Sequence, residues 1–131
     1  MPMQYARQYQ QTQVMTSSRV QIVVLLYDAA IQSIELARRG IEANNIPEKG
    51  RFLGRAISIV GELNSVLDFE QGGEIARSLR RIYDYILSEL VTANTRGDAH
   101  HLDGPVRCLG ELREAWVEVA TQERSLVGAG R

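Results

Sequence analysis

The side chains best suited to chemistry in this sequence are a histidine pair, His100 and His101, and a single cysteine, Cys108. Together they could suggest a metal or redox site. Adjacent residues on a helix point about 100° apart, however, so the two histidines cannot ligate one metal from the same face. A lone cysteine also forms no Cys-x-x-Cys motif and no internal disulfide. We therefore expect surface or capping histidines and a half-buried, unreactive cysteine.

Two tyrosine–aspartate pairs, Tyr27-Asp28 and Tyr83-Asp84, could support acid–base chemistry. Tyrosines at helical spacing more often pack in a core, with the hydroxyl reaching a polar partner. The sequence also lacks the Glu-x-x-His motif of di-iron bundles and any phosphate-binding loop. These absences predict a protein that is not an enzyme, with no catalytic residue, cofactor or metal.

The most informative segment is residues 66–76, Val-Leu-Asp-Phe-Glu-Gln-Gly-Gly-Glu-Ile-Ala. A helical apolar pattern enters it and another leaves it. Because each glycine costs about 1 kcal/mol inside a helix, Gly72 and Gly73 are predicted to form the turn between two helices. The Phe and three acidic residues beside them are unusual for a plain connection. This predicts a functional tip on a helical hairpin.

Composition restricts the class of protein. The chain has 131 residues, 44% of them hydrophobic, and a net charge of -1, which fits one soluble domain. That charge gives no basic field for nucleic acid. We find no uninterrupted run of about 18 apolar residues and no basic-then-apolar leader, so we expect no membrane insertion and no export. With one cysteine, a cytoplasmic location is expected.

Apolar residues spaced by three and four predict four helices, at about 18–43, 47–69, 74–96 and 105–120. Asn45 and Glu48 have the spacing of a capping box, Gly97 suits a helix C-terminus, and Asp98 and Asp103 suit N-caps. Short connections favour antiparallel neighbours. The predicted fold is all-α, an antiparallel up-down four-helix bundle with an N-terminal leader that caps it.

Three regions follow from this pattern: a flexible leader (1–17) that folds onto the bundle, the bundle itself (18–120) and a frayed tail (121–131). The leader carries the apolar residues Tyr5, Tyr9, Val14 and Met15 on a polar background. Either it covers a groove on the bundle or it is a disordered tail.

A stripe of small residues runs along the second predicted helix: Gly50, Gly54, Ser58, Gly61 and Ser65. Three helical glycines are costly, so a compensating close approach is expected. The leading interpretation is tight packing against a neighbouring helix. A shallow groove for a partner's backbone and simple tolerance on an exposed face are the alternatives.

Five blocks of sequence, residues 9–18, 25–31, 62–76, 83–85 and 111–116, resemble the FliS family of bacterial flagellin export chaperones. The resemblance covers about residues 5–118, in order and at the family's spacing. Arg19 and Ala29 depart from it, standing where the family usually has Pro and Gly, and Gly104-Pro105 is atypical of the fourth helix.

The resemblance implies a monomeric bundle that binds the C-terminal segment of flagellin 1:1, prevents premature polymerisation and delivers the client to the flagellar type III export apparatus. Export gate components and another flagellar regulator are further implied partners. The residues we expect to meet the client are Tyr9, Gln13, Val14, Thr16, Tyr27, Asp28, Gly54, Gly61, Asn64, Leu67, Asp68, Phe69 and Tyr83.

Two other functions remain open at this point. One is a helical adaptor for another flagellar regulatory protein. The other is a small all-α enzyme of chorismate-mutase type, which needs several cationic side chains converging in a bundle pocket. The arginines of this sequence are predicted to lie mainly on outer faces, which disfavours the enzyme.

Overall fold

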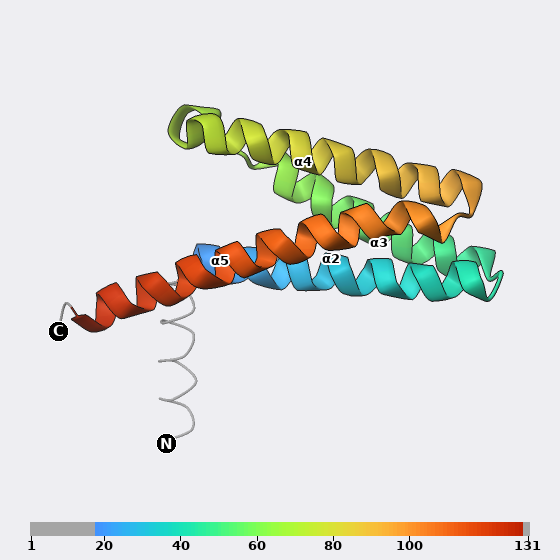
Figure 1. The fold of residues 1–131 in the computed structure, drawn as a ribbon, viewed down its shortest axis with the longest axis horizontal. Coiled ribbons are helices and arrows are strands. Elements are labelled where there is room, and N and C mark those ends of the chain that lie inside the picture. Colours follow the sequence, from blue (N-terminus) through green and yellow to red (C-terminus); the bar gives the residue numbers. More distant parts are fainter. Residues whose placement is uncertain (1–17, 130–131) are drawn as a thin grey trace, which may run out of the picture.

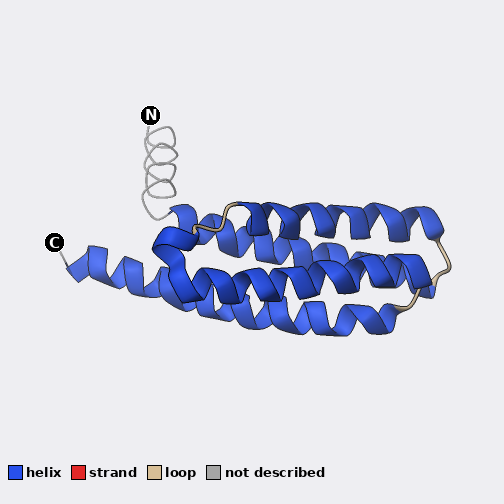
Figure 2. Ribbon diagram, turned by 90° about the horizontal axis from the view of Figure 1, so that it is seen from above, coloured by secondary structure: helices blue, strands red, loops and turns tan. Residues whose placement is uncertain are grey.

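A computed structural model describes residues 18–129, and it describes side chains from residue 19 to residue 122. The elements in chain order are α2 (Ser18–Glu42), α3 (Ile46–Ser65), α4 (Phe69–Arg96), the short 3-10 helix η1 (Ala99–Leu102) and α5 (Asp103–Ala129). The four long helices alternate in direction, and only short loops join them (Figures 1 and 2). The predicted antiparallel four-helix bundle is confirmed. The leader, residues 1–17, lies outside the described residues.

The core is one continuous apolar cluster contributed by all four long helices. Helix α2 packs against both α3 and α5, α3 packs against α4, and α4 meets α5. Each helix buries the stripe that its three-and-four spacing defines. The fully buried members with the largest side chains include Tyr27, Ile34, Leu53, Ile86, Leu90, Leu102 and Leu109.

The predicted helix ends are largely confirmed. The Asn45 side chain accepts a hydrogen bond from the Glu48 backbone at 3.2 Å, which caps α3. Gly97 ends α4 in the left-handed conformation, with φ of 62°, as a glycine C-cap does. Asp98 caps η1 rather than a regular helix, and α5 starts at Asp103.

The predicted turn at Gly72-Gly73 is wrong in position. Helix α3 already ends at Ser65, and the turn between the helices is formed by residues 66–68. Asp68 starts α4 early, because its carboxylate accepts from the backbone of Glu70 and Gln71, at 3.1 Å each. One helical turn later, Gly73 has φ of 50° and ψ of -124°, a conformation that favours glycine. The predicted break at the glycines is therefore present, because Gly73 separates the first turn of α4 from the rest of the helix, although the connection to α3 lies earlier, at residues 66–68.

Helix α5 continues to Ala129, past residue 120 where we placed the end of the bundle. In Figure 1 its C-terminal part projects beyond the other helices. Fraying of residues 121–131 stays a prediction.

Within the described residues, Arg19–Glu42 is long and apolar enough, by length and composition, to cross a membrane. The buried face of a core helix meets the same test. Tyr27, Ala30, Ile34 and Ala37 lie on that face, and each is fully buried in the bundle. Packing against α3 and α5 accounts for the apolarity of α2.

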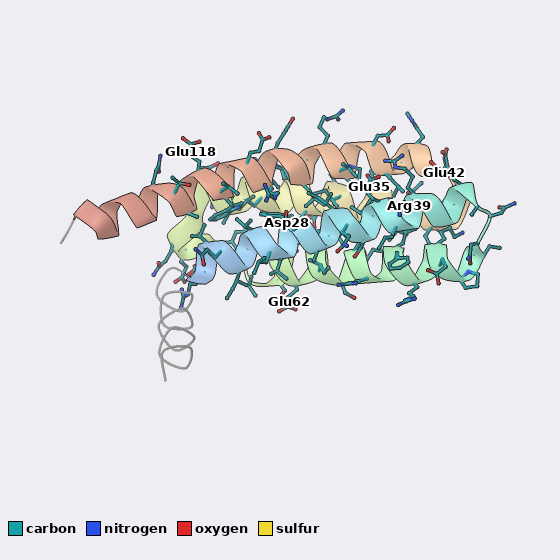
Figure 3. The ribbon with its side chains drawn as sticks, turned by 90° about the horizontal axis from the view of Figure 1, so that it is seen from below. Asp28, Glu35, Arg39, Glu42, Glu62 and Glu118 are labelled. Atoms are coloured by element: carbon teal, nitrogen blue, oxygen red, sulfur yellow. The ribbon has the colours of Figure 1, made fainter. Side chains whose placement is uncertain are left out.

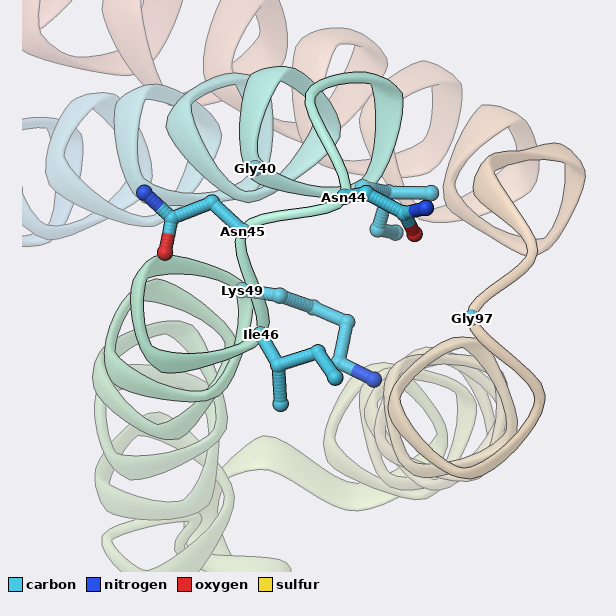
Figure 4. A pocket seen from close by; sticks show the side chains of 7 residues that line it. Gly40, Asn44, Asn45, Ile46, Lys49 and Gly97 are labelled. Atoms are coloured by element: carbon cyan, nitrogen blue, oxygen red, sulfur yellow. The ribbon is translucent and has the colours of Figure 1, made fainter.

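The hairpin between α2 and α3 contains a close approach of two helix backbones that depends on a glycine. A Cβ added to Gly40 would lie 2.8 Å from the Lys49 backbone nitrogen and 3.2 Å from its Cα. Figure 4 shows this corner, where Gly40 faces the start of α3 and the Lys49 side chain extends toward the end of α4. The Lys49 Nζ donates to the Asn94 carbonyl at 2.9 Å, so a cation lies at the C-terminal end of α4. This corner fixes the spacing of three helices.

Replacing Gly40 with alanine is expected to lower the free energy of unfolding by about 1–3 kcal/mol, because backbone atoms must move to admit the methyl group. Gly54→Ala is the matched control, since a Cβ there meets no atom within 4 Å. It should raise stability by about 0.5–1 kcal/mol through helix propensity. Urea unfolding of both variants measures whether each substitution lowers or raises the free energy of unfolding. A stabilising Gly40→Ala would contradict the close approach.

Candidate functional site

An apolar groove opens at the end of the bundle where α4 begins. In Figure 1, α4 and α5 lie close together near η1 and diverge toward this end. The groove has a volume of about 270 Å³. Its lining residues are Val23, Leu63, Val66, Leu67, Asp68, Gly72, Ile75, Ala76, Leu79, Tyr83 and Trp116. Ten of these eleven carry no charge, so the groove suits an apolar occupant.

The signature segment builds the mouth of this groove. Val66 lies in the turn between α3 and α4, and Ile75 follows the kink at Gly73; they are 67% and 72% exposed. Gly72 and Ala76 are small and lie one turn apart, which leaves room between the two larger side chains. Because both side chains line the same groove, they form a contiguous apolar patch, which is typical of a surface that a partner covers.

Three aromatic side chains from three helices form a hydrogen-bonded chain at the inner side of the groove. The Trp116 indole Nε1 of α5 donates to the Tyr27 hydroxyl of α2 at 3.0 Å. The hydroxyls of Tyr27 and Tyr83 lie 2.5 Å apart, and Tyr83 belongs to α4. Tyr83 and Trp116 line the groove, whereas Tyr27 lies behind them and is fully buried. Tyr27 therefore presents no surface to a partner in this conformation; its place is in the core.

Burial raises the pKa of both tyrosines above the ordinary value of 10.0, because the phenolate loses its hydration. For Tyr83 the hydrogen bond to Tyr27 raises the pKa further, and for Tyr27 its two hydrogen bonds offset part of the rise. Both groups are therefore neutral in the folded protein at physiological pH.

This pair predicts a loss of stability in alkali. Above about pH 10 the unfolded chain releases these two protons while the folded protein retains them, so the free energy of unfolding falls by roughly 1.4 kcal/mol per pH unit for each group. Below pH 10 the contribution of the two protonated tyrosines to the free energy of unfolding is fully present. Urea unfolding from about pH 9 to pH 11 measures the slope. The double variant Tyr27→Phe/Tyr83→Phe should show a shallower slope, and equal slopes would contradict the assignment.

Asp28, expected to offer an acceptor to the client, is already engaged within the chain. Its carboxylate pairs with the Arg113 guanidinium of α5, with a second contact between Arg113 Nη2 and Asp28 Oδ2 at 3.5 Å. This contact raises the pKa of Arg113, which stays charged. Glu62 and Glu118 differ, since they project outward from α3 and α5 (Figure 3). The Asp28–Arg113 pair thus joins α2 to α5.

The remaining residues predicted around the end of α3 divide between the groove and its surroundings. Leu67 and Asp68 line the groove, although the Asp68 carboxylate also caps α4. Asn64 lies outside it and donates from Nδ2 to the Asp84 carboxylate of α4 at 3.0 Å. Its Oδ1 is buried without a partner among the described residues. Phe69 is 41% exposed and does not line the groove.

The small-residue stripe of α3 is open to solvent. A Cβ added to Gly50, Gly54 or Gly61 would meet nothing within 4 Å, and Gly54 is exposed. The interpretation as tight helix packing is therefore wrong. Either a partner covers this face or the glycines are tolerated there. The leader residues Tyr9, Gln13, Val14 and Thr16 lie outside the described residues, so their roles stay predictions.

The groove contains residues that motif reasoning did not select for the site. Val66 and Ile75 belong to the signature segment, and their exposure could not be read from a helical pattern that assigns both to an apolar stripe. Trp116 lies in the matched block of the fourth helix and, as the one tryptophan of the sequence, was a usable signal.

In the part of the chain that the structure describes, the polar clusters away from the groove show no catalytic arrangement. His101 bonds Glu89 at 3.0 Å, His100 lies exposed in η1, and Cys108 is a free, half-buried thiol. Among the residues that the structure describes, no three His, Cys, Asp or Glu side chains are placed to hold a metal ion. Fold and site thus define a small helical-bundle protein that carries an apolar groove where α4 begins.

Sequence comparison identifies the family. The family model described as "Flagellar protein FliS" matches residues 1–123, so this chain belongs to the FliS family. The flagellar secretion chaperone FliSB of Pseudomonas aeruginosa is 38% identical over 118 residues, which cover 87% of this chain and 94% of that protein. The flagellar secretion chaperone FliS of Salmonella typhimurium is 35% identical, over 88% of this chain and 87% of that protein.

A third relative, the flagellar secretion chaperone FliS of Vibrio cholerae, is 31% identical over 90% of this chain and 87% of its own length. The resemblance found in the sequence is confirmed. The family consists of chaperones of flagellar secretion and not of enzymes, which confirms the prediction of a non-enzyme.

Proposed function

We propose that this protein is a cytoplasmic export chaperone that binds the C-terminal segment of flagellin, prevents its premature polymerisation and delivers it to the flagellar type III export apparatus. The observation that carries the proposal is the exposed apolar groove in a chain of the FliS family. An amphipathic segment that normally buries its apolar face in a filament needs a substitute surface until it is exported. A groove between helices supplies such a surface.

The groove's composition suits this task. A client helix can cover Val66 and Ile75, which are the most exposed large side chains at its mouth. Each large aliphatic side chain taken out of water stabilises a complex by about 1.5–3 kcal/mol. Ordering a flexible client offsets part of this gain, so the complex is releasable despite a large contact area. Release is what delivery to an export machine requires.

The other site residues are proposed to serve a client that continues beyond the groove. Asn64 on α3 and Phe69 at the start of α4 are next to groove-lining residues in the sequence, and the open face at Gly61 and Gly54 lets a backbone approach α3 closely. The leader residues would compete for, or line, the same surface. Export gate components, and another flagellar regulator, are proposed to bind the loaded complex. An adaptor role toward such a regulator alone is the second candidate.

The test is direct binding to the cognate flagellin. Calorimetry with a peptide of its C-terminal segment should give a 1:1 complex, and full-length flagellin should co-elute with the chaperone as a soluble species. A peptide with the same composition in scrambled order is the control, because it keeps the hydrophobicity and loses the amphipathic pattern. No heat with the native peptide, together with no co-elution, would reject this function. Binding of a flagellar regulator but not of flagellin would favour the adaptor.

A further inference from the structure

The chain of Trp116, Tyr27 and Tyr83 carries three hydrogens that could be donated but contains only two hydrogen bonds, so one hydrogen is left over. The indole is a donor only, and each hydroxyl carries one hydrogen. Trp116 donates to Tyr27, and a single hydrogen lies between the hydroxyls of Tyr27 and Tyr83. The other phenolic hydrogen of the pair has no acceptor among the described residues. A buried donor without an acceptor lowers stability by about 1–3 kcal/mol. The direction in which this hydrogen points therefore matters.

Burial decides which tyrosine carries the spare hydrogen. Tyr27 is fully buried, and its hydroxyl is hydrogen-bonded to Trp116 and to Tyr83. Tyr83 is 2% exposed and lines the groove. The arrangement that buries no orphaned hydrogen in the core has Tyr27 donating to Tyr83. The hydrogen of Tyr83 then points away from Tyr27, and Tyr83 is the one of these two tyrosines that lines the groove.

We propose that the Tyr83 hydroxyl is a polar anchor in the groove and donates a hydrogen bond to a main-chain carbonyl oxygen of the bound flagellin segment. This inference rests on the proposed function. The acceptor would come from a helix end or an extended stretch, because carbonyls inside a helix are already paired. In an apolar groove, one fixed donor sets the register of a client that apolar contacts alone would let slide.

Tyr83→Phe tests the anchor, because it removes the hydroxyl and keeps the ring. Affinity for the flagellin C-terminal peptide should fall roughly 3- to 12-fold, the equivalent of one hydrogen bond. Tyr85→Phe is the matched control: it is the same substitution two residues away on α4, at a side chain that is 44% exposed and does not line the groove. It should bind like the native protein. Circular dichroism and thermal melting verify that each variant is folded.

Two readouts separate the possible outcomes. Trp116 is the one tryptophan of the chain and lines the groove, so its fluorescence reports occupancy while calorimetry reports affinity. Peptides in which single amides are replaced by esters, whose carbonyls accept more weakly, should lose affinity toward the native protein. For one ester position in the peptide, the loss of affinity seen with the native protein should be absent with Tyr83→Phe, because the hydroxyl that bonded this carbonyl is gone.

Native-like affinity of Tyr83→Phe, or no ester position whose effect depends on the hydroxyl, would overturn the anchor and leave the proposed function standing. An equal loss in Tyr85→Phe would overturn it too. Failure of the native protein to bind the peptide would reject both the function and the anchor.

Discussion

A double substitution, Val66→Glu with Ile75→Glu, is expected to weaken binding of the flagellin C-terminal segment by roughly 100-fold or more. Both side chains stand at the mouth of the groove and are largely exposed without a client. Binding would bury them, and a glutamate there forfeits the apolar gain and places an unpaired charge against an apolar client. The free energy of unfolding should change by no more than about 0.5 kcal/mol, since exposed positions are tolerant.

Val91→Glu is the matched control for this prediction. Val91 is also an exposed aliphatic residue of α4, at 52%, but it does not line the groove. Calorimetry should find near-native affinity for Val91→Glu and almost none for the double variant, with equal helicity in both. Tight binding by the double variant would place the client elsewhere on the bundle. Equal weakening by Val91→Glu would show a general effect of charge.

The largest effect on stability is expected for Tyr27→Ala, which should lower the free energy of unfolding by about 3–5 kcal/mol. Tyr27 is fully buried where α2, α4 and α5 meet, and its hydroxyl accepts from Trp116. The variant loses the packing of a ring and leaves the indole hydrogen without its acceptor. A domain is typically stable by only about 5–15 kcal/mol, so partial unfolding at physiological temperature follows.

Denaturant unfolding followed by circular dichroism measures this loss. Tyr27→Phe keeps the ring and should cost only about 1 kcal/mol, while Tyr85→Ala, at a more exposed tyrosine of α4, should cost little. A charged residue at position 27 would thus abolish client binding through the fold, and not through a lost contact. If Tyr27→Ala kept native stability but failed to bind the client, the core assignment would be wrong and Tyr27 would belong to the binding surface.

Local sequence features predicted the ends of the helices wherever a cap decides them. Asn45, Gly97 and Asp98 act within one turn of their own position, so their geometry follows from residue type. The same reasoning placed the α3–α4 turn wrongly. The prediction relied on the helix-breaking tendency of the two glycines. Asp68, which precedes them in the sequence, already caps and starts α4. Gly73 then breaks the helical conformation a second time, after the first turn of α4.

Position 104 shows a different limit. Gly104-Pro105 was a departure from the family's pattern with no local explanation. In the bundle Pro105 is buried in the first turn of α5, and a Cβ at Gly104 would meet the Tyr85 hydroxyl of α4. The departure is therefore matched by a neighbour that lies 19 positions away in sequence, and residue type alone could not reveal it.

What the sequence determined by itself was the family, the number of helices and the apolar stripe of each, because these depend on short-range periodicity and ordered motifs. The tertiary structure decided which apolar residues a neighbouring helix covers. Tyr27 and Ile75 belong to similar helical stripes, yet one is fully buried and the other is 72% exposed. The cause is the divergence of α4 from α5, which removes a packing partner from one end of the bundle and leaves a groove there.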